Sequence, residues 1–314
     1  MRVVVVVPMW NQLELTQRCL RSLQELTPQP QHVIVVDNGS WPDPRPALES
    51  VLPGVSVVRL ERNRGFAGGC NVGIRRALAD AADAVLLLNN DAVVDPGALA
   101  HLVRALRQDE RIAAAGVKTL TDEAPPRIHA AYSVLTFHAP LVRVEGWLEP
   151  CIDRFDEERD VDSVSGGAML IRRGALEAIG DFDEEFFAYH EDVDWCMRAR
   201  RAGWRIRYVP AARVYHRMHA STGGGYGSPV IYLVARSSVL FVRKHASPAQ
   251  VLKFAAYTAG GLLKDVGYRW HTGELKGFAL RLRGLRDGLL RRPVPLEAMG
   301  LVTRAEPADR AATA

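Results

Sequence analysis

The stretch AVLLLNND, residues 84–91, decides the fold that the sequence predicts. Its five aliphatic residues, 84–88, are typical of a strand that is buried on both faces, as strands of parallel sheets are. The run ends in Asn89, Asn90 and Asp91, which puts polar and acidic side chains at the carboxyl end of that strand. Ligands of open α/β sheets bind at this end of the strands. The stretch therefore predicts a buried parallel strand with a binding site beside it.

Strand-like and helix-like segments alternate on both sides of this stretch. The predicted strands before it are Val3–Val7, Val33–Val36 and Val55–Leu60, and the predicted helices around it are Leu13–Leu26, Asn71–Leu78 and Ala98–Leu106. Apolar residues recur at helical spacing in the helices, and prolines or turn residues follow several of the segments. This βαβαβαβ order predicts an α/β fold with a doubly wound, mostly parallel sheet.

The second half of the chain has a less regular pattern. Residues 120–160 are polar and contain prolines, which indicates a long loop or an edge hairpin. Ordered structure is expected again over Val161–Ile171, followed by a helix over Glu191–Ala202 and helices beyond Pro229. Two short strands are predicted between these helical regions, Arg205–Val209 and Arg213–Tyr215.

Composition limits the class of protein. A chain of 314 residues with 48% hydrophobic residues can bury a full core as one large domain or two smaller ones. The four cysteines lie too far apart for zinc-finger or redox spacing, which favours a reducing, cytoplasmic compartment. No signal peptide is expected at the N-terminus, and no apolar run reaches the roughly 20 residues of a membrane span.

The charge is unevenly distributed along the chain. Residues 243–292 hold 11 lysines and arginines against 3 acidic residues, although the whole chain carries only +4. A basic region on a mildly acidic body indicates an anionic partner, such as a membrane surface, a lipid phosphate or nucleic acid. A solvated basic helix face explains the same charge equally well.

Two turns near the predicted site have more than one explanation. Asp37 follows the second strand and precedes Asn38, Gly39 and Ser40. It either accepts hydrogen bonds from a nucleobase or ribose, or forms an Asx-turn. The glycine-rich residues 64–69 have the wrong spacing for a dinucleotide fingerprint. They indicate a close backbone approach to a ligand or a flexible turn into the next helix.

Asp91 is a candidate ligand of a divalent cation. Mg²⁺ in proteins takes one or two carboxylates together with substrate phosphates, and Asn90 can bond a ribose or those phosphates. The alternative is a helix N-cap, but Asp95 already occupies that place in the sequence. His216 follows a predicted strand and is either structural or a metal ligand. The glycine-rich residues 221–228 beyond it are suited to a lid.

Three carboxylates crowd the start of the predicted helix at Glu191. The helix dipole favours anions there, but Glu191, Asp192 and Asp194 repel one another. Such crowding raises the pKa of one carboxyl toward the working pH, which suits a general base. Trp195 follows at helical spacing and is expected in the core.

Six motifs in a fixed order carry a family resemblance: Val3–Asn11, Val35–Ser40, Asn63–Ala67, Leu87–Asp91, Gly166–Ala168 and Glu191–Trp195. Together they resemble the family 2 inverting glycosyltransferases of the GT-A fold, over roughly residues 1–245. The likeness is to the bacterial branch of rhamnosyltransferases and galactofuranosyltransferases. It implies a GT-A nucleotide-sugar-binding and catalytic domain over residues 1–228 and a basic, helical C-terminal region over residues 229–314.

The resemblance also implies roles for single residues on the donor side. The donor would be a dTDP- or UDP-sugar, with rhamnose as the first expectation, and it would be bound by Pro8, Asn11, Asp37, Asn63, Asn71, Asn89, Asn90 and Asp91. Asp37 matches the base-binding aspartate of the family. Asp91 matches the last acid of the D-x-D motif, which holds Mg²⁺ or Mn²⁺, and His216 matches the additional metal ligand. Asn89 stands where the family often has the first acid, so a single carboxylate remains.

On the acceptor side, the resemblance assigns Asp192 as the catalytic base, with Glu191 next to it. Gly166 and Gly167 would line the cleft, and Trp195 would shape the acceptor side. The acceptor would be a glycan or a lipid-linked saccharide, and no nucleic-acid partner is expected. The other classes that remain are a non-catalytic nucleotide-sugar or glycan-binding module and a nucleotidyltransferase. A nucleotidyltransferase would be expected to have a basic loop after the first strand, where residues 8–11 have none.

The basic C-terminal helices suit a cytoplasmic enzyme that is peripheral on the inner face of the plasma membrane. The basic residues predicted to meet anionic headgroups are Arg269, Lys276, Arg281, Arg283 and Arg286. Leu280, Leu282, Leu285 and Leu289 would face the bilayer or the core. A homodimer interface or a packed helical cap accounts for the same pattern.

Overall fold

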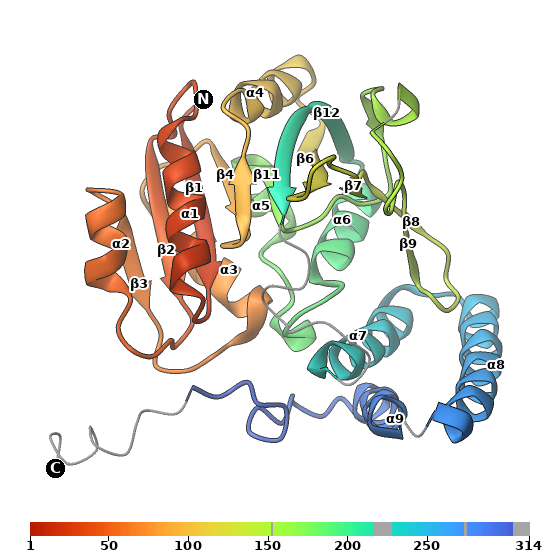
Figure 1. Ribbon diagram of the computed structural model, residues 1–314. Coiled ribbons are helices and arrows are strands. Elements are labelled where there is room, and N and C mark those ends of the chain that lie inside the picture. The colour runs from red at the N-terminus through yellow and green to blue at the C-terminus, as the bar shows by residue number, and fades with distance from the viewer. Residues whose placement is uncertain (152, 217–227, 273–274, 304–314) are drawn as a thin grey trace, which may run out of the picture.

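The computed structural model describes residues 1–151, 153–216, 228–272 and 275–303 (Figure 1). Its strands are β1 Val3–Met9, β2 His32–Asp37, β3 Ser56–Arg59, β4 Ala84–Leu88, β5 Ala92–Val94, β6 Ile112–Thr121, β7 Ile128–Ala130, β8 Ser133–Leu135, β9 Val142–Val144, β10 Arg159–Asp160, β11 Ala168–Arg172 and β12 Arg205–His216. The main sheet has the order β10-β12-β6-β11-β4-β1-β2-β3, with β5 paired to β12 and β7 to β6. Strands β8 and β9 form a separate hairpin.

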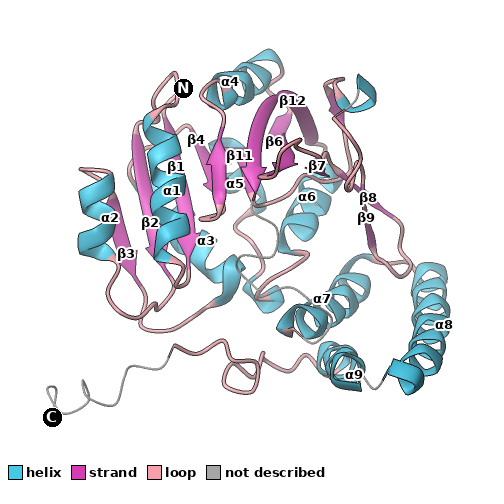
Figure 2. Cartoon of the chain, viewed as in Figure 1, coloured by secondary structure: helices cyan, strands magenta, loops and turns pink. Residues whose placement is uncertain are grey.

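Helices cover both faces of this sheet (Figure 2). They are α1 Leu13–Gln24, α2 Arg45–Val51, α3 Gly65–Ala79, α4 Ala98–Gln108, α5 Arg173–Ile179, α6 Glu191–Arg201, α7 Pro229–His245, α8 Pro248–Thr272 and α9 Leu275–Leu289, with short 3-10 turns at Asp153–Phe155 and Glu184–Phe186.

The parallel half of the sheet follows the sequence prediction. β1 pairs in parallel with β2 and β4, and β2 pairs in parallel with β3. Because side chains alternate along a strand, Val3, Val5 and Val7 join the core cluster that contains residues of α1 and α4. Val4 and Val6 join the opposite cluster, with residues of α3 and α6. The predicted α/β order and the two-sided burial of these strands are confirmed.

Helix α3 corrects the prediction for the glycine-rich stretch. The helix begins at Gly65, six residues before the predicted start, so residues 65–69 are its first turns and not a flexible linker. The glycines serve close packing within the protein: a Cβ on Gly65 would lie 2.3 Å from the Phe187 carbonyl oxygen, and one on Gly73, further along the helix, would lie 2.2 Å from Cγ1 of Val6. The helix therefore lies unusually near β1, and its N-terminus is brought to the carboxyl ends of the strands.

The second half of the sheet contains β6, which the sequence analysis missed. All ten residues of β6 are buried, and the strand pairs in parallel with β12 and antiparallel with β11. The predicted strands Arg205–Val209 and Arg213–Tyr215 are one strand, β12, with an irregular register between Val209 and Arg213. Residues 120–160, predicted as a long loop or an edge hairpin, contain short strands, among them the hairpin β8–β9, which is a separate sheet and not an edge of the main one.

Helices α7 to α9 confirm the helical C-terminal region, and part of it is built into the core. Gly284 of α9 approaches the backbone of α7, and residues of α6 and α7 share one hydrophobic cluster. Leu280 and Leu285 pack inward, whereas Leu282 and Leu289 are exposed. The side chain of Arg269 lies outside the described part. Within the described residues no helix combines the length and apolar character needed to cross a membrane.

Candidate functional site

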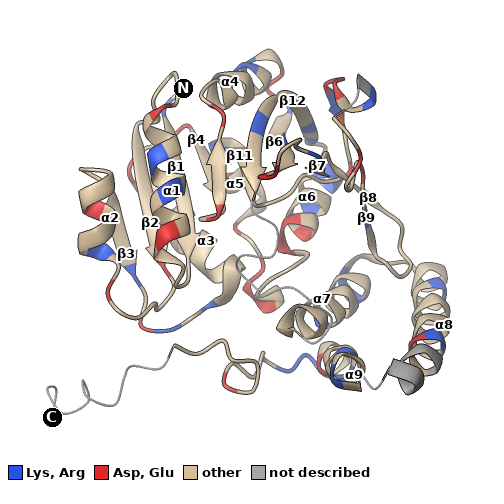
Figure 3. Ribbon diagram, viewed as in Figure 1, with Lys and Arg blue, Asp and Glu red and all other residues tan. Residues whose placement is uncertain are grey.

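The predicted site residues gather at the carboxyl ends of the parallel strands. Figure 3 shows acidic residues where β4 ends and at the start of α6. Asp37 ends β2, Asn89 to Asp91 follow β4, and His216 ends β12. The loops after these strands lie at one edge of the sheet, which we call the strand-end face. Both predicted acidic groups, Asp91 and the carboxylates at the start of α6, are present there. Residues 217–227, including most of the predicted lid, lie outside the described residues.

Asp37 makes a local side-chain-to-backbone hydrogen bond in the loop after β2, one residue further along than in the predicted Asx-turn. Its carboxylate is fully buried, and Oδ1 accepts a hydrogen bond from the Ser40 amide at 2.9 Å. Oδ2 lies 3.6 Å from Nε of Arg59, and Arg59 also donates to the Ser40 carbonyl. The hydrogen bond and the ion pair together fix the loop after β2.

Asparagines join the loops that follow β1, β2 and β3. Oδ1 of Asn11 accepts from the Trp41 amide at 3.3 Å, and Oδ1 of Asn63 accepts from the Gly65 amide at 2.8 Å. Asn38, which was not predicted as a site residue, donates to the Gly65 carbonyl and accepts from the Arg64 amide. Its place directly after Asp37 was the only signal in the sequence. The loops thus form one bonded rim, next to which Pro8 lies buried.

Asn71, which the resemblance implied as a donor residue, is bonded inside the protein. Its side chain is fully buried in α3, where Nδ2 donates to the Phe182 carbonyl at 2.9 Å and Oδ1 accepts from the Phe182 amide at 3.0 Å. Both polar atoms of the amide are therefore occupied by the backbone of a distant loop. Asn71 anchors that loop to α3.

Gly166 and Gly167 connect the end of β4 to the start of α6. The Asn89 amide donates to the Gly167 carbonyl at 2.8 Å, and the Gly166 amide donates to Oδ2 of Asp192 at 2.8 Å. A Cβ on Gly167 would lie 3.0 Å from Nδ2 of Asn89, and one on Gly166 would lie 3.1 Å from Cβ of Asp192. The two glycines therefore bring both halves of the predicted site together.

Asp91 and His216 meet although 125 positions separate them in the sequence. Nε2 of His216 lies 2.9 Å from Oδ1 of Asp91, because β5 and β12 pair antiparallel beside the turn. His129 of β7, which the sequence analysis did not single out, stacks on the His216 ring with centroids 5.0 Å apart. Asn90 donates to Oγ1 of Thr16 at 3.0 Å and so holds the turn against α1.

The three carboxylates at the start of α6 have different environments. Asp192 is partly exposed, and its oxygens accept from the Gly166 and Val193 amides. Burial raises the pKa of Asp192, and these amide hydrogen bonds oppose the rise. Glu191 is buried, and its Oε2 has no hydrogen-bond partner among the described residues. Burial, with the charge of Asp192 added, raises the pKa of Glu191 well above its ordinary value.

Asp194 lies between α6 and α7, where its carboxylate is bonded to two cationic side chains and a histidine. Its carboxylate contacts Nε of Arg198 at 2.8 Å, Nζ of Lys244 at 2.8 Å and Nε2 of His245 at 2.7 Å. Burial alone would raise the pKa of Asp194, but the bonds from His245 and Lys244 and the charge of Arg198 lower it overall. Asp194 is therefore a charged anchor for the helix that carries Asp192.

Trp195 is a core residue. Its side chain is fully buried among residues of the cluster below the sheet, and Nε1 donates to the Gly180 carbonyl at 2.8 Å. The prediction from helical spacing is confirmed, and the role of Trp195 on the acceptor side stays a prediction from the resemblance.

The residues present can contribute part of a metal site. In the described part of the chain no group of three histidine, cysteine, aspartate or glutamate side chains could hold a metal ion. Asp91 and His216 nevertheless lie side by side, and the Asp91 carboxylate with diphosphate oxygens meets the usual needs of Mg²⁺. The pair therefore fits a cation that is bound together with the donor.

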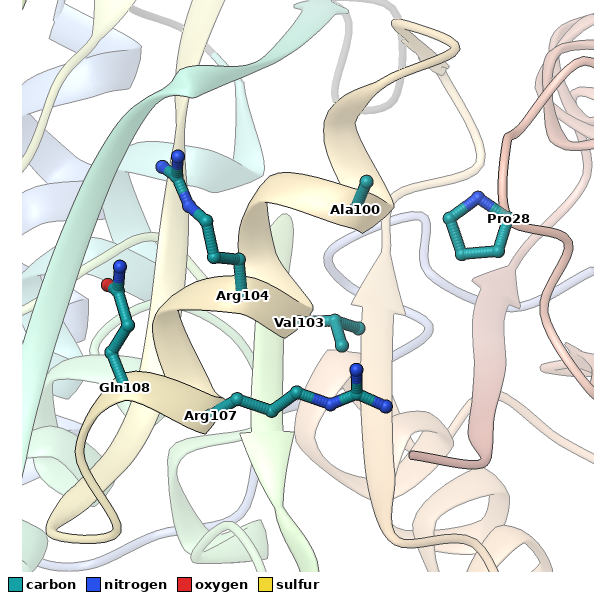
Figure 4. Close-up of a pocket in the computed structure, with 6 residues that line it drawn as sticks. All are labelled: Pro28, Ala100, Val103, Arg104, Arg107 and Gln108. Atoms are coloured by element: carbon teal, nitrogen blue, oxygen red, sulfur yellow. The ribbon is translucent and has the colours of Figure 1, made fainter.

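A pocket elsewhere on the surface is separate from this site. It has a volume of about 360 Å³ and lies between α4 and the loop after α1, with Arg104 and Arg107 on its wall (Figure 4). None of the predicted site residues lines it. The strand-end face is thus the better candidate on chemical grounds.

Comparison with known proteins identifies the family. A family model described as "Glycosyltransferase like family 2" matches residues 1–226. The chain belongs to glycosyltransferase family 2. The N-acetylglucosaminyl-diphospho-decaprenol L-rhamnosyltransferase of Mycobacterium tuberculosis is 30% identical to this glycosyltransferase over 249 residues, which is 72% of this chain and 78% of the relative.

Solved structures agree with the fold of this family. The mannosyltransferase PcManGT from Pyrobaculum calidifontis, in complex with GDP-Man and Mn²⁺, matches with a TM-score of 0.56 and 16% identity over 92% of this chain and 87% of that one. GalNAc-T7 with UDP, GalNAc and Mn²⁺ matches with a TM-score of 0.61 and 18% identity over 76% of this chain. This chain spans about half of GalNAc-T7, 47% of its length. The predicted GT-A fold is confirmed.

Proposed function

We propose that this glycosyltransferase moves a sugar from a dTDP- or UDP-linked donor to a hydroxyl of a glycan or lipid-linked acceptor, with inversion at the anomeric carbon. The sugar that we propose is rhamnose. One observation carries the proposal: the Gly166 amide holds the Asp192 carboxylate at 2.8 Å, on the turn that also bonds to Asn89. A base thereby stands beside the end of β4, where the donor diphosphate would lie. The rhamnosyltransferase relative supports this choice of sugar.

The donor would lie across the strand ends. Asp37 and the bonded loops with Pro8, Asn11 and Asn63 would receive the nucleoside, and Asn89 to Asp91 would border the diphosphate. Mg²⁺ or Mn²⁺, held by Asp91, His216 and the diphosphate, would offset the negative charge of the leaving group. Crystallisation of fold relatives with Mn²⁺ supports this cation.

Asp192 would act as the general base. Two backbone amides fix its carboxylate, and burial moves its pKa toward the working pH, which favours proton transfer. It would take the proton of the acceptor hydroxyl, whose oxygen then attacks the anomeric carbon opposite the diphosphate. Glu191 would stay protonated, because two adjacent charges in this buried setting repel each other.

A lipid-linked acceptor would be met at a membrane surface, and α8 has a suitable face. Leu252, Leu263 and Val266 recur at helical spacing and are exposed, with fractions of 73%, 76% and 45%. Lys253 and Lys264 border them, as in helices that lie in the headgroup region. The predicted basic residues of α9 support this less, because Arg281 pairs with Asp265 and Arg286 with Asp287.

The test of function compares wild type with Asp192→Asn, and with Asp194→Asn as the same change at the neighbouring carboxylate of α6. Transfer of rhamnose from dTDP-rhamnose to octyl N-acetylglucosaminide is measured by mass spectrometry, in reactions that contain Mn²⁺. We expect Asp192→Asn to lose at least about a hundredfold in kcat while it still binds dTDP, because general-base catalysis contributes about 10²–10⁴-fold. Full activity of Asp192→Asn would remove it as the base. A wild type that binds dTDP- and UDP-sugars but transfers none to any acceptor would overturn the enzymatic proposal in favour of a binding module.

A further inference from the structure

An exposed tryptophan is connected to the Asp91–His216 pair through the ring of His129. Trp147 follows β9 and has 47% of its surface exposed, the largest fraction for a tryptophan among the exposed hydrophobic residues. Its ring packs on His129 with centroids 5.0 Å apart and an interplanar angle of 50°. His129 stacks on His216, again at 5.0 Å, and His216 contacts Asp91. Three rings therefore lead from the candidate site to the surface.

The turn that presents Trp147 is held firmly. Both neighbours have positive φ, +81° for Gly146 and +58° for Leu148. The Leu148 amide donates to the Ile128 carbonyl at 2.8 Å, and the Ile128 amide donates to the Glu149 carbonyl at 2.9 Å. A left-handed leucine costs on the order of 1 kcal/mol, so it persists only where surrounding bonds fix it. Trp147 is thus presented in one position by the strand-like contacts with Ile128.

The sheet order indicates which substrate reaches this tryptophan. Asp37 ends β2 on one side of β4, whereas His216 ends β12 on the other side. A donor that extends from Asp37 to Asp91 would occupy the first side. The diphosphate and its cation would reach the second side only as far as His216, and the surface beyond His216 toward Trp147 remains for the acceptor. An exposed indole offers a flat apolar face with a negative π-cloud, and the C–H face of a pyranose packs on such a surface.

We propose that Trp147 is the platform on which a pyranose ring of the acceptor stacks, with His129 as the support that fixes the indole. This rests on the proposed sugar transfer. Trp147 would be a specificity-determining residue for the acceptor and would make no contact with the donor.

The experiment measures acceptor KM, donor KM and donor hydrolysis without acceptor, for wild type, Trp147→Ala, Trp147→Phe and Leu148→Ala. Leu148→Ala is the matched control, because it removes an exposed apolar side chain from the same turn. One aromatic contact is worth about 0.5–1.5 kcal/mol, so Trp147→Ala should raise the acceptor KM for octyl N-acetylglucosaminide about 2- to 12-fold. Donor KM and hydrolysis should not change, and Trp147→Phe should retain most of the affinity.

An unchanged acceptor KM in Trp147→Ala, or an equal rise in Leu148→Ala, would overturn the platform. A loss of pelleting with anionic vesicles in both variants, with acceptor KM unchanged, would instead make this turn a membrane contact. Saturation-transfer NMR with octyl N-acetylglucosaminide alone separates this inference from the catalytic one. Loss of the sugar-ring signals in Trp147→Ala supports the platform even if no nucleotide sugar is turned over, and retained signals refute it.

Discussion

Replacing Asp194 with alanine should both destabilise the protein and misplace its base. The Asp194 side chain is 0% exposed and contacts three cationic or donor groups, two of them on α7. Removal of one partner from a buried ion pair costs about 3–5 kcal/mol. Arg198 and Lys244 remain 22% and 35% exposed, so water can partly solvate them after the change. We therefore expect a loss of about 2–4 kcal/mol, somewhat below that range.

The hydrogen bonds around Asp194 also show how His245 contributes to this cluster. Arg201 donates to Nδ1 of His245 at 2.8 Å, and an arginine cannot accept, so Nδ1 is the acceptor. The proton must then be on Nε2, which donates to Asp194 at 2.7 Å. His245 is thus a neutral donor, and the charges that balance Asp194 come from Arg198 and Lys244.

Urea unfolding followed by circular dichroism measures the loss, with Asp80→Ala as the control. Asp80 pairs with Arg76 on the surface of α3, where such pairs contribute about 0–0.5 kcal/mol. Because the folded state lowers the pKa of Asp194, its contribution is complete above the ordinary aspartate value of about 3.9 and is lost as the pH falls through the folded value. The difference in the free energy of unfolding between wild type and Asp194→Ala should therefore decrease as the pH is lowered below about 4.

The catalytic consequence can be measured in the same variant. Asp192 lies two residues before Asp194, and a misplacement of about 1 Å can cost about a hundredfold in rate. We expect kcat to fall at least tenfold under conditions where Asp194→Ala remains folded. A variant that loses less than about 0.5 kcal/mol and keeps its kcat would refute the claim that this cluster fixes α6 on α7.

Two further predictions concern the buried glutamate and the exposed helix. The pKa of Glu191 is raised in the folded state, so that state binds more protons than the unfolded one and loses stability as pH rises through the window above the ordinary glutamate value. Urea unfolding should therefore show Glu191→Gln gaining stability over wild type between pH 4 and pH 8, and parallel pH profiles would contradict this. On α8, Leu252→Asp with Leu263→Asp should lower pelleting with anionic vesicles several-fold, whereas Arg104→Ala should not. Unchanged pelleting, with a dimer to monomer shift in sedimentation, would identify the face as a subunit interface.

The sequence predicted the parallel half of the fold because its signals are local. Aliphatic runs such as Val3–Val7 are buried on both faces, and amphipathic segments between them form helices, so propensity and environment agree. Strand β6 was missed because IAAAGV, residues 112–117, has little β-propensity. Its burial arises from distant packing: Val164 fills the space over Gly116 so closely that a Cβ there would lie 2.3 Å away.

The sequence was sufficient to predict which residue types lie at the candidate site, but not which partners each of them contacts. Strand ends and a crowded helix start marked Asp91 and Asp192, since both follow from chain order. The meeting of Asp91 with His216 also agrees with the prediction from resemblance. The internal hydrogen bonds of Asn71 and Trp195 could not be predicted, because their partners, Phe182 and Gly180, are backbone groups of a distant loop. Trp147 carried no periodic signal at all.

The C-terminal helices connect the proposed membrane face to the catalytic helix. α7 provides Lys244 and His245 to Asp194, and it leads directly into α8. The β8–β9 hairpin makes a second connection, because His138 at its tip stacks on Tyr257 of α8 with centroids 4.6 Å apart. The same hairpin continues into the turn that presents Trp147. A bilayer bound at α8 would therefore be fixed relative to the base through α7 and relative to the acceptor platform through the hairpin. On the proposed function, the basic C-terminal region would belong to the catalytic architecture, and its removal should lower kcat even with a soluble acceptor.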